Sequence, residues 1–242
     1  MSDTEGDVEC YNEKLAAIYD DIYHFKDYDK DVAYVVRCVR QRLPDAHTLL
    51  EVACGTGLHT GGLSAAFQLE GLDRSSAMLK RAQAKHPGVV FHQGDMIHFD
   101  LGRTYDVACC LFRTIAFTET LENFHRAVAA MARHLRTGGL LLIEPFFTPD
   151  SYWVGHVKMN ILDKPDLKIA WMYVSEREGD VGIMNNHFLI GRPSGVEHFT
   201  EVHRVALLSH EDYESAFSAS GLDLEYDAVG PGGLGFYIGR RA

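Results

Sequence analysis

Apolar residues recur at helical spacing through residues 11–42, before any strand pattern begins. Leu15 and Ile18 belong to a first stripe and Val35 belongs to a second, and the spacing is interrupted around residues 24–29. Apolar positions three and four residues apart are typical of an amphipathic helix. The pattern therefore predicts two helices ahead of the first strand.

From residue 48 onward, short apolar runs alternate with helical patterns. The runs predict strands at residues 48–53, at residues up to 73, and at 89–92, 108–111 and 140–143. The helical patterns between them lie at residues 59–66, 75–85 and 121–135. Alternation of this kind is typical of right-handed βαβ units. We expect an α/β fold with a parallel sheet and helices on both of its faces.

The pattern changes after residue 151. Segments rich in β-branched and aromatic residues lie at 169–175, 183–190, 195–199 and 202–208, with turn residues between them. Such segments favour antiparallel strands. A helix at 211–220 and short strands at 226–228 and 235–239 follow. The sequence thus predicts an antiparallel layer inserted before the last helix of the core.

Composition narrows the classes of partner. The chain has 242 residues, which suits one α/β core, and a net charge of -11, which repels nucleic acid and acidic membrane surfaces. The acidic start and the absence of a long apolar run favour the cytoplasm and no membrane contact. Five cysteines form no CxxC pair and thirteen histidines form no HExxH, so we expect reduced thiols and no metal site.

The turn after the first strand is a candidate nucleotide site. Residues 51–57 read EVACGTG, and Gly55 and Gly57 let the backbone turn sharply and approach a ligand closely. The alternative is a tight strand-to-helix turn with no ligand. Asp73, at the end of the second strand, lies where an acidic side chain accepts hydrogen bonds from ribose hydroxyls. Asp95 and Met96 close the third strand, where they can face an adenine.

The same turn separates two classes of adenosine cofactor. A dinucleotide site has a third glycine against its pyrophosphate, but Thr60 stands there, and Glu51 adds a negative charge beside the loop. Negative charge repels a pyrophosphate and suits the sulfonium and ammonium groups of S-adenosylmethionine (SAM). We expect SAM, and an NAD enzyme is the remaining alternative.

The motifs LLEVACGTG, GLDRSSAMLKRA, HQGDMIHFDL, YDVACCLF and LRTGGLLLIEPFF resemble those of the class I SAM-dependent methyltransferases, with their Rossmann-like sheet flanked by helices. This resemblance covers roughly residues 49–147 and implies that Asp73 holds the ribose while Asp95 and Met96 flank the adenine. The expected cofactor contacts are Glu51, Ala53, Gly55, Thr56, Gly57, Asp73, Arg74, Met78, Asp95, Met96 and Leu111.

A closer resemblance, over nearly the whole chain, is to bacterial N-methyltransferases of dTDP-linked amino sugars in antibiotic biosynthesis. It is carried by IYDDIYHFKDY, EPFFTPDSYW and HFTEVHRVALLSHEDYESAFSASGL. The chain departs from that group at Arg113 and at residues 233–235. The resemblance implies a nucleotide-linked sugar that accepts one or two methyl groups on its amine, with an inserted antiparallel β layer over the acceptor site.

This interpretation divides the chain into four parts. Residues 1–45 are expected to form helices covering the active site, 46–150 the SAM-binding core, 151–210 the inserted β layer on the acceptor side, and 211–242 the closing helix and strands. A homodimer is one alternative for the oligomeric state.

Candidates for the acceptor side lie on several of these parts. Glu144, at the end of the fifth strand, and Tyr23 are the candidate catalytic residues. The candidate substrate contacts are Tyr19, Tyr23, Arg113, Trp153, Arg177 and His187. For each of them, ordinary packing or a structural ion pair is the alternative.

Methyl transfer from a sulfonium chiefly requires that the nucleophile be held about 3 Å from the methyl group in a straight line. Several other activities share that requirement. The alternatives left open are a sugar O-methyltransferase, an N-methyltransferase of small metabolites, and a SAM-binding module without catalysis.

Overall fold

Two helices precede the sheet within the residues that the structure describes, as the interrupted apolar pattern predicts. The computed structural model describes residues 11–242, so Cys10 and the start of the 1–45 region lie outside it. Helix α1 spans Glu13–Ile22 and helix α2 spans Tyr28–Arg42. The Asn12 side chain accepts hydrogen bonds from the first turn of α1, and the interruption falls between the two helices.

The central sheet has the strand order β10-β11-β5-β4-β1-β2-β3 within residues 11–242. Strands β1 to β5 pair in parallel, whereas β11 pairs antiparallel with both β5 and β10. The strands are β1 (Thr48–Val52), β2 (Gln68–Asp73), β3 (Val90–Gln93), β4 (Tyr105–Cys110), β5 (Leu135–Ile143), β10 (Leu222–Asp227) and β11 (Phe236–Arg241). The predicted α/β class with a largely parallel sheet is confirmed.

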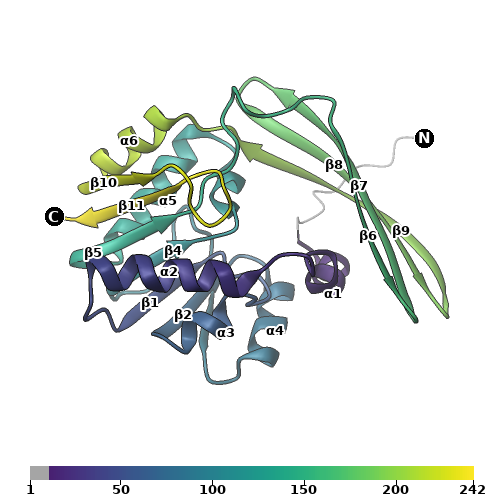
Figure 1. Cartoon of the computed structure of the whole chain (residues 1–242), viewed down its shortest axis with the longest axis horizontal. Coiled ribbons are helices and arrows are strands. Elements are labelled where there is room, and N and C mark those ends of the chain that lie inside the picture. Colours follow the sequence, from purple (N-terminus) through teal and green to yellow (C-terminus); the bar gives the residue numbers. More distant parts are fainter. Residues whose placement is uncertain (1–10) are drawn as a thin grey trace.

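Helices cover both faces of this sheet. Successive residues of its strands point to opposite sides, and apolar side chains on both sides need to be buried. Leu50 packs in the layer that contains Phe124, whereas its neighbour Leu49 packs with Val35. Figure 1 shows α2 across one face and α5 on the other. The remaining helices are α3 (Thr60–Ser64), α4 (Ser76–Lys85), the 3-10 helix η1 (Thr114–Thr118), α5 (Leu121–Arg133) and α6 (His210–Ala219).

A separate antiparallel sheet is inserted between β5 and α6. Its strand order in the described chain is β6-β7-β8-β9. The strands are β6 (Val157–Lys164), β7 (Leu167–Glu178), β8 (Val181–Arg192) and β9 (Gly195–Ala206). Figure 1 shows α1 between this sheet and the core. Leu15 and Ile18 of α1 pack there against Trp171 and Phe188 of the inserted sheet.

The inserted sheet corrects two of the sequence predictions. Residues 195–199 and 202–208 are not two strands, because β9 runs through both as one. Strand β6 is missing from the predicted segments, since Lys158 and Asn160 occupy positions that face inward, where an apolar residue would be expected. Separately, no helix of residues 11–242 is both long enough and apolar enough to cross a membrane.

Candidate functional site

The loop after β1 has an unusual backbone. Ala53, Gly55 and Gly57 all have positive φ angles, of 58°, 56° and 78°. An added Cβ on Gly55 would meet no atom within 4 Å, whereas one on Gly57 would lie 2.9 Å from the His86 ring. Gly57 is therefore needed for close packing within the protein, while the space beside Gly55 is open to a ligand.

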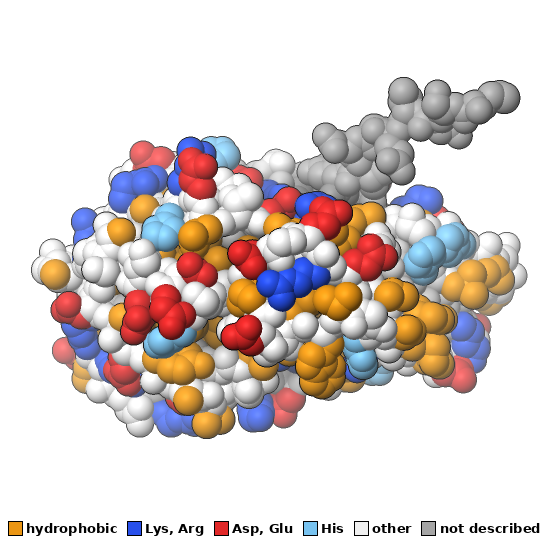
Figure 2. Space-filling view, turned by 90° about the horizontal axis from the view of Figure 1, so that it is seen from above, with side chains coloured by type: hydrophobic (Ala, Val, Ile, Leu, Met, Phe, Trp, Pro, Cys, Tyr) orange, Lys and Arg blue, Asp and Glu red, His pale blue; other side chains and the backbone are white. Residues whose placement is uncertain are grey.

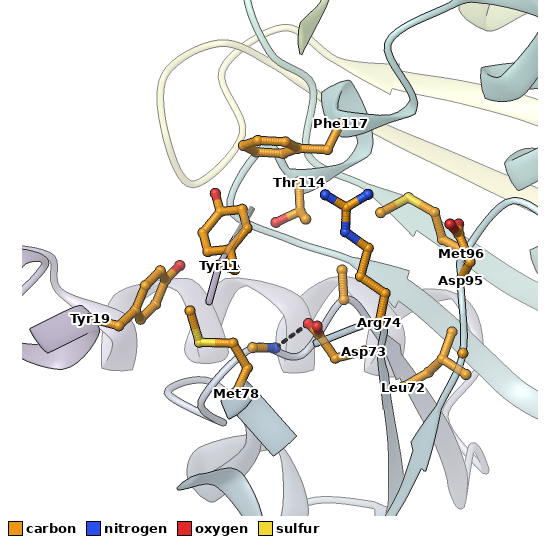
Figure 3. A pocket seen from close by; sticks show the side chains of 13 residues that line it. Tyr11, Tyr19, Leu72, Asp73, Arg74, Met78, Asp95, Met96, Thr114 and Phe117 are labelled. Atoms are coloured by element: carbon orange, nitrogen blue, oxygen red, sulfur yellow. Dashed lines mark hydrogen bonds between the residues drawn. The ribbon is translucent and has the colours of Figure 1, made fainter. Parts of the chain in front are cut away.

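Beside this loop lies a cleft of about 650 Å³, here called the cofactor cleft. It is lined by Tyr11, Tyr19, Ala53, Gly55, Leu72, Asp73, Arg74, Met78, Gly94, Asp95, Met96, Thr114 and Phe117. Figure 3 shows Asp73 and Met78 on one side of the cleft and Thr114 with Phe117 on the other. The carboxyl ends of β1, β2 and β3 thus meet at one hollow, as the sequence predicts.

Asp73 is held rigidly on the wall of the cofactor cleft. Its Oδ2 accepts the backbone N–H of Gly55 at 2.8 Å and its Oδ1 accepts that of Ser75 at 2.9 Å. Burial raises the pKa of Asp73, although these hydrogen bonds oppose the shift. Each oxygen keeps a further lone pair for a ligand hydroxyl, so Asp73 is an oriented acceptor.

Glu51 lies in an adjoining hollow of about 350 Å³. Thr56 and Leu111 also line this hollow, so it contains three more of the predicted cofactor residues. Burial raises the pKa of Glu51 to about 7, against the opposing effect of His59. The Thr60 hydroxyl donates a 2.5 Å hydrogen bond to the Glu51 carboxylate. Glu51 can therefore gain or lose its charge near neutral pH.

A larger cavity of about 1000 Å³, here called the acceptor cavity, lies between the core and the inserted sheet. It is lined by Tyr11, Tyr19, Tyr23, Phe25, Phe112, Arg113, Thr114, Phe117, Phe146, Lys158, Asn160, Trp171, Tyr173, Met184, Asn186, His203 and Val205. Tyr11, Tyr19, Thr114 and Phe117 also line the cofactor cleft. The two spaces therefore share a wall, and three predicted residues, Tyr19, Tyr23 and Arg113, lie in the acceptor cavity.

Tyr19 and Tyr23 lie one helical turn apart on α1, with ring centroids 4.8 Å apart. Burial raises the pKa of both phenols far above their usual value. Both therefore stay neutral over the physiological range and can donate hydrogen bonds to a ligand, but neither is a proton acceptor at neutral pH.

Glu144, a predicted acceptor contact, has a backbone partner in a loop of the cavity wall. Its side chain does not line the acceptor cavity, and Oε2 accepts the backbone N–H of Phe112 at 2.6 Å. Phe112 and Arg113 both have positive φ angles, of 54° and 62°. The amide of this partly buried loop needs an acceptor, and Glu144 supplies one. Its Oε1 lies 3.9 Å from Nε of Arg113, so Glu144 positions this loop.

Two further predicted substrate residues lie away from the acceptor cavity. Trp153 is 69% exposed, and its ring contacts His156. His187 stacks on His198 on the outer face of the inserted sheet. Side chains alternate between the faces of a strand, so the neighbouring Asn186 faces the cavity and His187 faces away.

Arg177 also fails to reach the acceptor cavity. Its guanidinium donates hydrogen bonds to the carbonyls of Pro149 and Gly179 and pairs with Asp180 at 3.1 Å. Because these partners belong to the turn between β7 and β8 and to the segment before β6, Arg177 fastens that end of the inserted sheet.

The structure also brings residues to the acceptor cavity that the sequence analysis missed. Tyr11, Phe117 and His203 all line it, and Glu201 is buried next to His203. Glu201 and His203 could have been found from the sequence, because they follow the buried Phe199 at intervals of two residues. This spacing places polar groups on the inward face of β9. Across residues 11–242, no group of three or more His, Cys, Asp or Glu side chains is arranged to hold a metal ion.

Comparisons with known proteins match this architecture. The model of a methyltransferase domain matches residues 49–139. The dTDP-3-amino-3,4,6-trideoxy-alpha-D-glucopyranose N,N-dimethyltransferase of Streptomyces venezuelae is 36% identical, over 96% of this chain and 100% of its own length. The dTDP-3-amino-3,6-dideoxy-alpha-D-glucopyranose N,N-dimethyltransferase of Streptomyces fradiae is 34% identical, over 98% of this chain and 95% of its own.

Solved structures show the same likeness. DesVI of Streptomyces venezuelae superposes with a TM-score of 0.89 at 37% identity, covering 94% of this chain and 98% of its own. SAM-bound CalS10 of Micromonospora echinaspora, an amino pentose methyltransferase involved in calicheamicin biosynthesis, superposes with a TM-score of 0.85 at 35% identity. That match covers 93% of this chain and 97% of the CalS10 chain. The likeness therefore includes the inserted sheet as well as the core.

Proposed function

This chain belongs to the SAM-dependent N-methyltransferases of amino sugars, and we propose that it methylates the amine of a dTDP-linked deoxy amino sugar in antibiotic biosynthesis. The observation that carries this proposal is the wall shared by the cofactor cleft and the acceptor cavity. A methyl group at the end of the cleft and an amine in the cavity would meet there, and in-line transfer requires this proximity.

The residues of the cofactor cleft fit the adenosine of SAM. Asp73 presents two oriented oxygens to the ribose hydroxyls, and the open space beside Gly55 admits the sugar. Asp95 and Met96 end the cleft at β3, where they would face the adenine amino group and pack on its ring. When bound, SAM supplies an activated methyl group on a sulfonium.

The adjoining hollow fits the amino-acid end of SAM. Glu51 is its acidic group, and Thr56 and Leu111 stand beside it. A cationic ammonium in this hollow would stabilise the charged form of Glu51. This assignment accounts for a carboxyl group buried at the end of β1 that has no cationic partner in direct contact among residues 11–242.

The acceptor cavity fits an uncharged sugar ring with a charged nucleotide end. Aromatic side chains such as Tyr19, Tyr23 and Trp171 line much of it, whereas Arg113 and Lys158 are its cations among the described residues. Guanidinium and ammonium groups are suited to the oxygens of a diphosphate. We therefore propose that Arg113 and Lys158 bind the diphosphate. The amine would then lie at the aromatic wall that the cavity shares with the cofactor cleft.

The predicted parts of the chain take their roles from this assignment. The region 1–45 contributes α1, whose tyrosines close both spaces, and the region 151–210 contributes the sheet that covers the acceptor. The region 46–150 provides the cofactor cleft, and 211–242 completes the central sheet.

Incubation with SAM and candidate acceptors tests the proposal directly. The candidates are dTDP-linked amino sugars, the matching sugars with hydroxyl in place of amine, and free amino acids. Mass spectrometry should show a gain of one or two methyl groups on the amino sugars alone. Methylation of the hydroxyl sugars or of the amino acids, or no methylation of any acceptor, would overturn the proposal. The Asp73→Ala variant serves as the cofactor-binding control.

We also propose that the enzyme is a homodimer through the outer face of its inserted sheet. Val157, Met159 and Ile161 of β6 lie on this face beside Met172 of β7 and Leu189 of β8, and each is between 41% and 60% exposed. Figure 2 shows hydrophobic side chains gathered toward the end of the molecule where this sheet lies. An apolar patch of this kind on a sheet face is typical of a protein interface.

The cysteines support a reducing compartment. Cys38, Cys54, Cys109 and Cys110 are free and buried among the described residues. Free buried thiols are usual where disulfides do not form. We therefore place the reaction in the cytoplasm.

A further inference from the structure

A buried histidine and carboxylate pair borders the acceptor cavity. His203 and Glu201 both point inward from β9 and are 4% and 3% exposed. His203 Nε2 lies 3.2 Å from Oε2 of Glu201, and the same oxygen accepts the backbone N–H of Tyr11 at 3.2 Å. The other oxygen, Oε1, is buried without a hydrogen-bond partner in the described structure. Removing this pair from water costs free energy, so a function is needed to explain its position.

The imidazole lies where the two spaces meet. Its ring stacks on Tyr11 with centroids 5.1 Å apart and meets the edge of Phe117 at 5.4 Å. Tyr11 and Phe117 line both the cofactor cleft and the acceptor cavity, and Figure 3 shows the two rings close to each other. His203 therefore stands next to the wall at which we place the amine.

No other described group lining the acceptor cavity is suited to take a proton near neutral pH. Burial raises the pKa of the Tyr19, Tyr23 and Tyr173 phenols, which are already weak acids. Arg113 and Lys158 are cations, and no carboxylate lines the cavity along residues 11–242. An imidazole, by contrast, ordinarily titrates close to neutrality.

We infer that His203 accepts the proton that the sugar amine must lose before it attacks, with Glu201 as the residue that positions it. This inference rests on the proposed function. An ammonium gives its proton to the imidazole, and the freed nitrogen lone pair forms a bond to the methyl carbon. The C–S bond breaks, and its electron pair stays on sulfur. The imidazolium then releases the proton to water, so each methyl transfer yields one proton.

Glu201 sets the tautomer that this role requires. A proton on Nε2 donates to the Glu201 carboxylate, which leaves the lone pair on Nδ1. Among residues 11–242, the His203 ring has no hydrogen bond other than that to Glu201.

Substitution of the pair separates a chemical role from a structural one. His203→Gln should lower kcat/KM for the amino sugar about 100-fold at pH 7, the usual size of a lost general base. The deficit should shrink to less than about threefold near pH 9, because a growing fraction of the amine is already neutral. Glu201→Gln should move the acid limb of the pH profile to lower pH, since a neutral amide replaces the carboxylate that accepts from Nε2 of His203. Around the ring, the titratable neighbours are Glu201 and Tyr11, with Tyr23 close to Glu201.

Two controls make the result decisive. His156→Gln, an exposed histidine before β6, should match the wild type at every pH. Calorimetry with SAM should give the wild-type affinity for His203→Gln, which shows that the variant is folded. A deficit that is equal at every pH, or smaller than threefold at pH 7, would overturn the role of His203 while leaving the proposed function intact.

If His203→Gln does not fold, the wild-type and Glu201→Gln profiles decide the question. Acid limbs at the same pH in both would overturn the inference. A wild-type chain that methylates no amino sugar would overturn the proposed function, and this inference with it.

Discussion

The backbone N–H of Gly55 donates to Oδ2 of Asp73 at 2.8 Å and so joins the ends of β1 and β2 beneath the cofactor cleft. The bond holds the carboxylate in place before any ligand arrives. Because Asp73 is then spared the loss of side-chain freedom on binding, its contribution to affinity is larger than that of a mobile carboxylate.

Asp73→Ala should therefore weaken SAM binding about 100-fold, because hydrogen bonds to a charged group each contribute about 1.5–3 kcal/mol. Isothermal titration calorimetry measures the effect. Asp223→Ala, at an exposed position of β10, is the matched control and should bind SAM as the wild type does. Equal affinities for SAM in the wild type and Asp73→Ala would contradict the role assigned to Asp73.

Glu144 should affect the acceptor and not the cofactor. Glu144→Gln keeps the size of the side chain but removes the charge opposite Arg113, whose loop lines the acceptor cavity. We expect kcat/KM for the amino sugar to fall at least tenfold, while the dissociation constant for SAM changes less than threefold, since the Arg113 guanidinium loses the charge of the buried carboxylate beside it. Steady-state kinetics measure kcat/KM, and calorimetry measures the dissociation constant for SAM. A SAM affinity lowered as much as in Asp73→Ala would refute this division.

Glu51 should make the stability of the ligand-free protein depend on pH. Burial raises its pKa from 4.5 to about 7, so the folded state favours the neutral acid. Its contribution to the free energy of unfolding is complete below pH 4.5. This contribution, about 3 kcal/mol, is lost as the pH rises through 7. Relative to the Glu51→Gln variant, the wild type should lose most of this amount, about 2.5 kcal/mol, between pH 5 and pH 8.

Urea denaturation at pH 5 and pH 8 measures the difference between the two proteins. Other titrating groups are common to both and cancel. Saturating SAM should reduce the pH dependence if its ammonium lies beside Glu51. A stability difference that is the same at both pH values would show that Glu51 does not titrate in this range.

The outer face of the inserted sheet should control the oligomeric state. We expect the wild type to have twice the 27.1 kDa mass of one chain in solution. Ile161→Glu places a charge within the proposed interface, so it should yield monomers. Light scattering after size exclusion measures both masses. Val229→Glu, at a still more exposed position on the loop before β11, should leave the dimer intact. A monomeric wild type would exclude the proposed dimer.

Local signals explain why the cofactor cleft could be predicted. The glycines after β1, Asp73 after β2 and Asp95 after β3 each follow an apolar strand within a few residues. Parallel strands bring their carboxyl ends to one edge of the sheet, so three separate local patterns converge. Gly57 is the exception, because it lines neither the cofactor cleft nor the Glu51 hollow and its backbone carbonyl contacts His86.

The acceptor cavity depended on contacts between distant segments, and prediction there was weaker. Trp153 and Arg177 were predicted from their residue type and their distance along the chain, neither of which reports the direction of a side chain. A shift of one residue along a strand reverses the face, as the pair Asn186 and His187 shows. Glu144 follows its strand as expected, yet it turns to the Phe112 amide.

The order of strands and helices in the core, the glycine loop and the acidic strand ends were determined by the sequence alone, because each depends on neighbours a few residues apart. Only the tertiary structure decided which side chains meet across the acceptor cavity. His203, Tyr11 and Phe117 come from β9, from the segment before α1 and from η1. Their meeting depends on how the inserted sheet packs on α1 and the core, and no periodicity within one segment encodes that geometry.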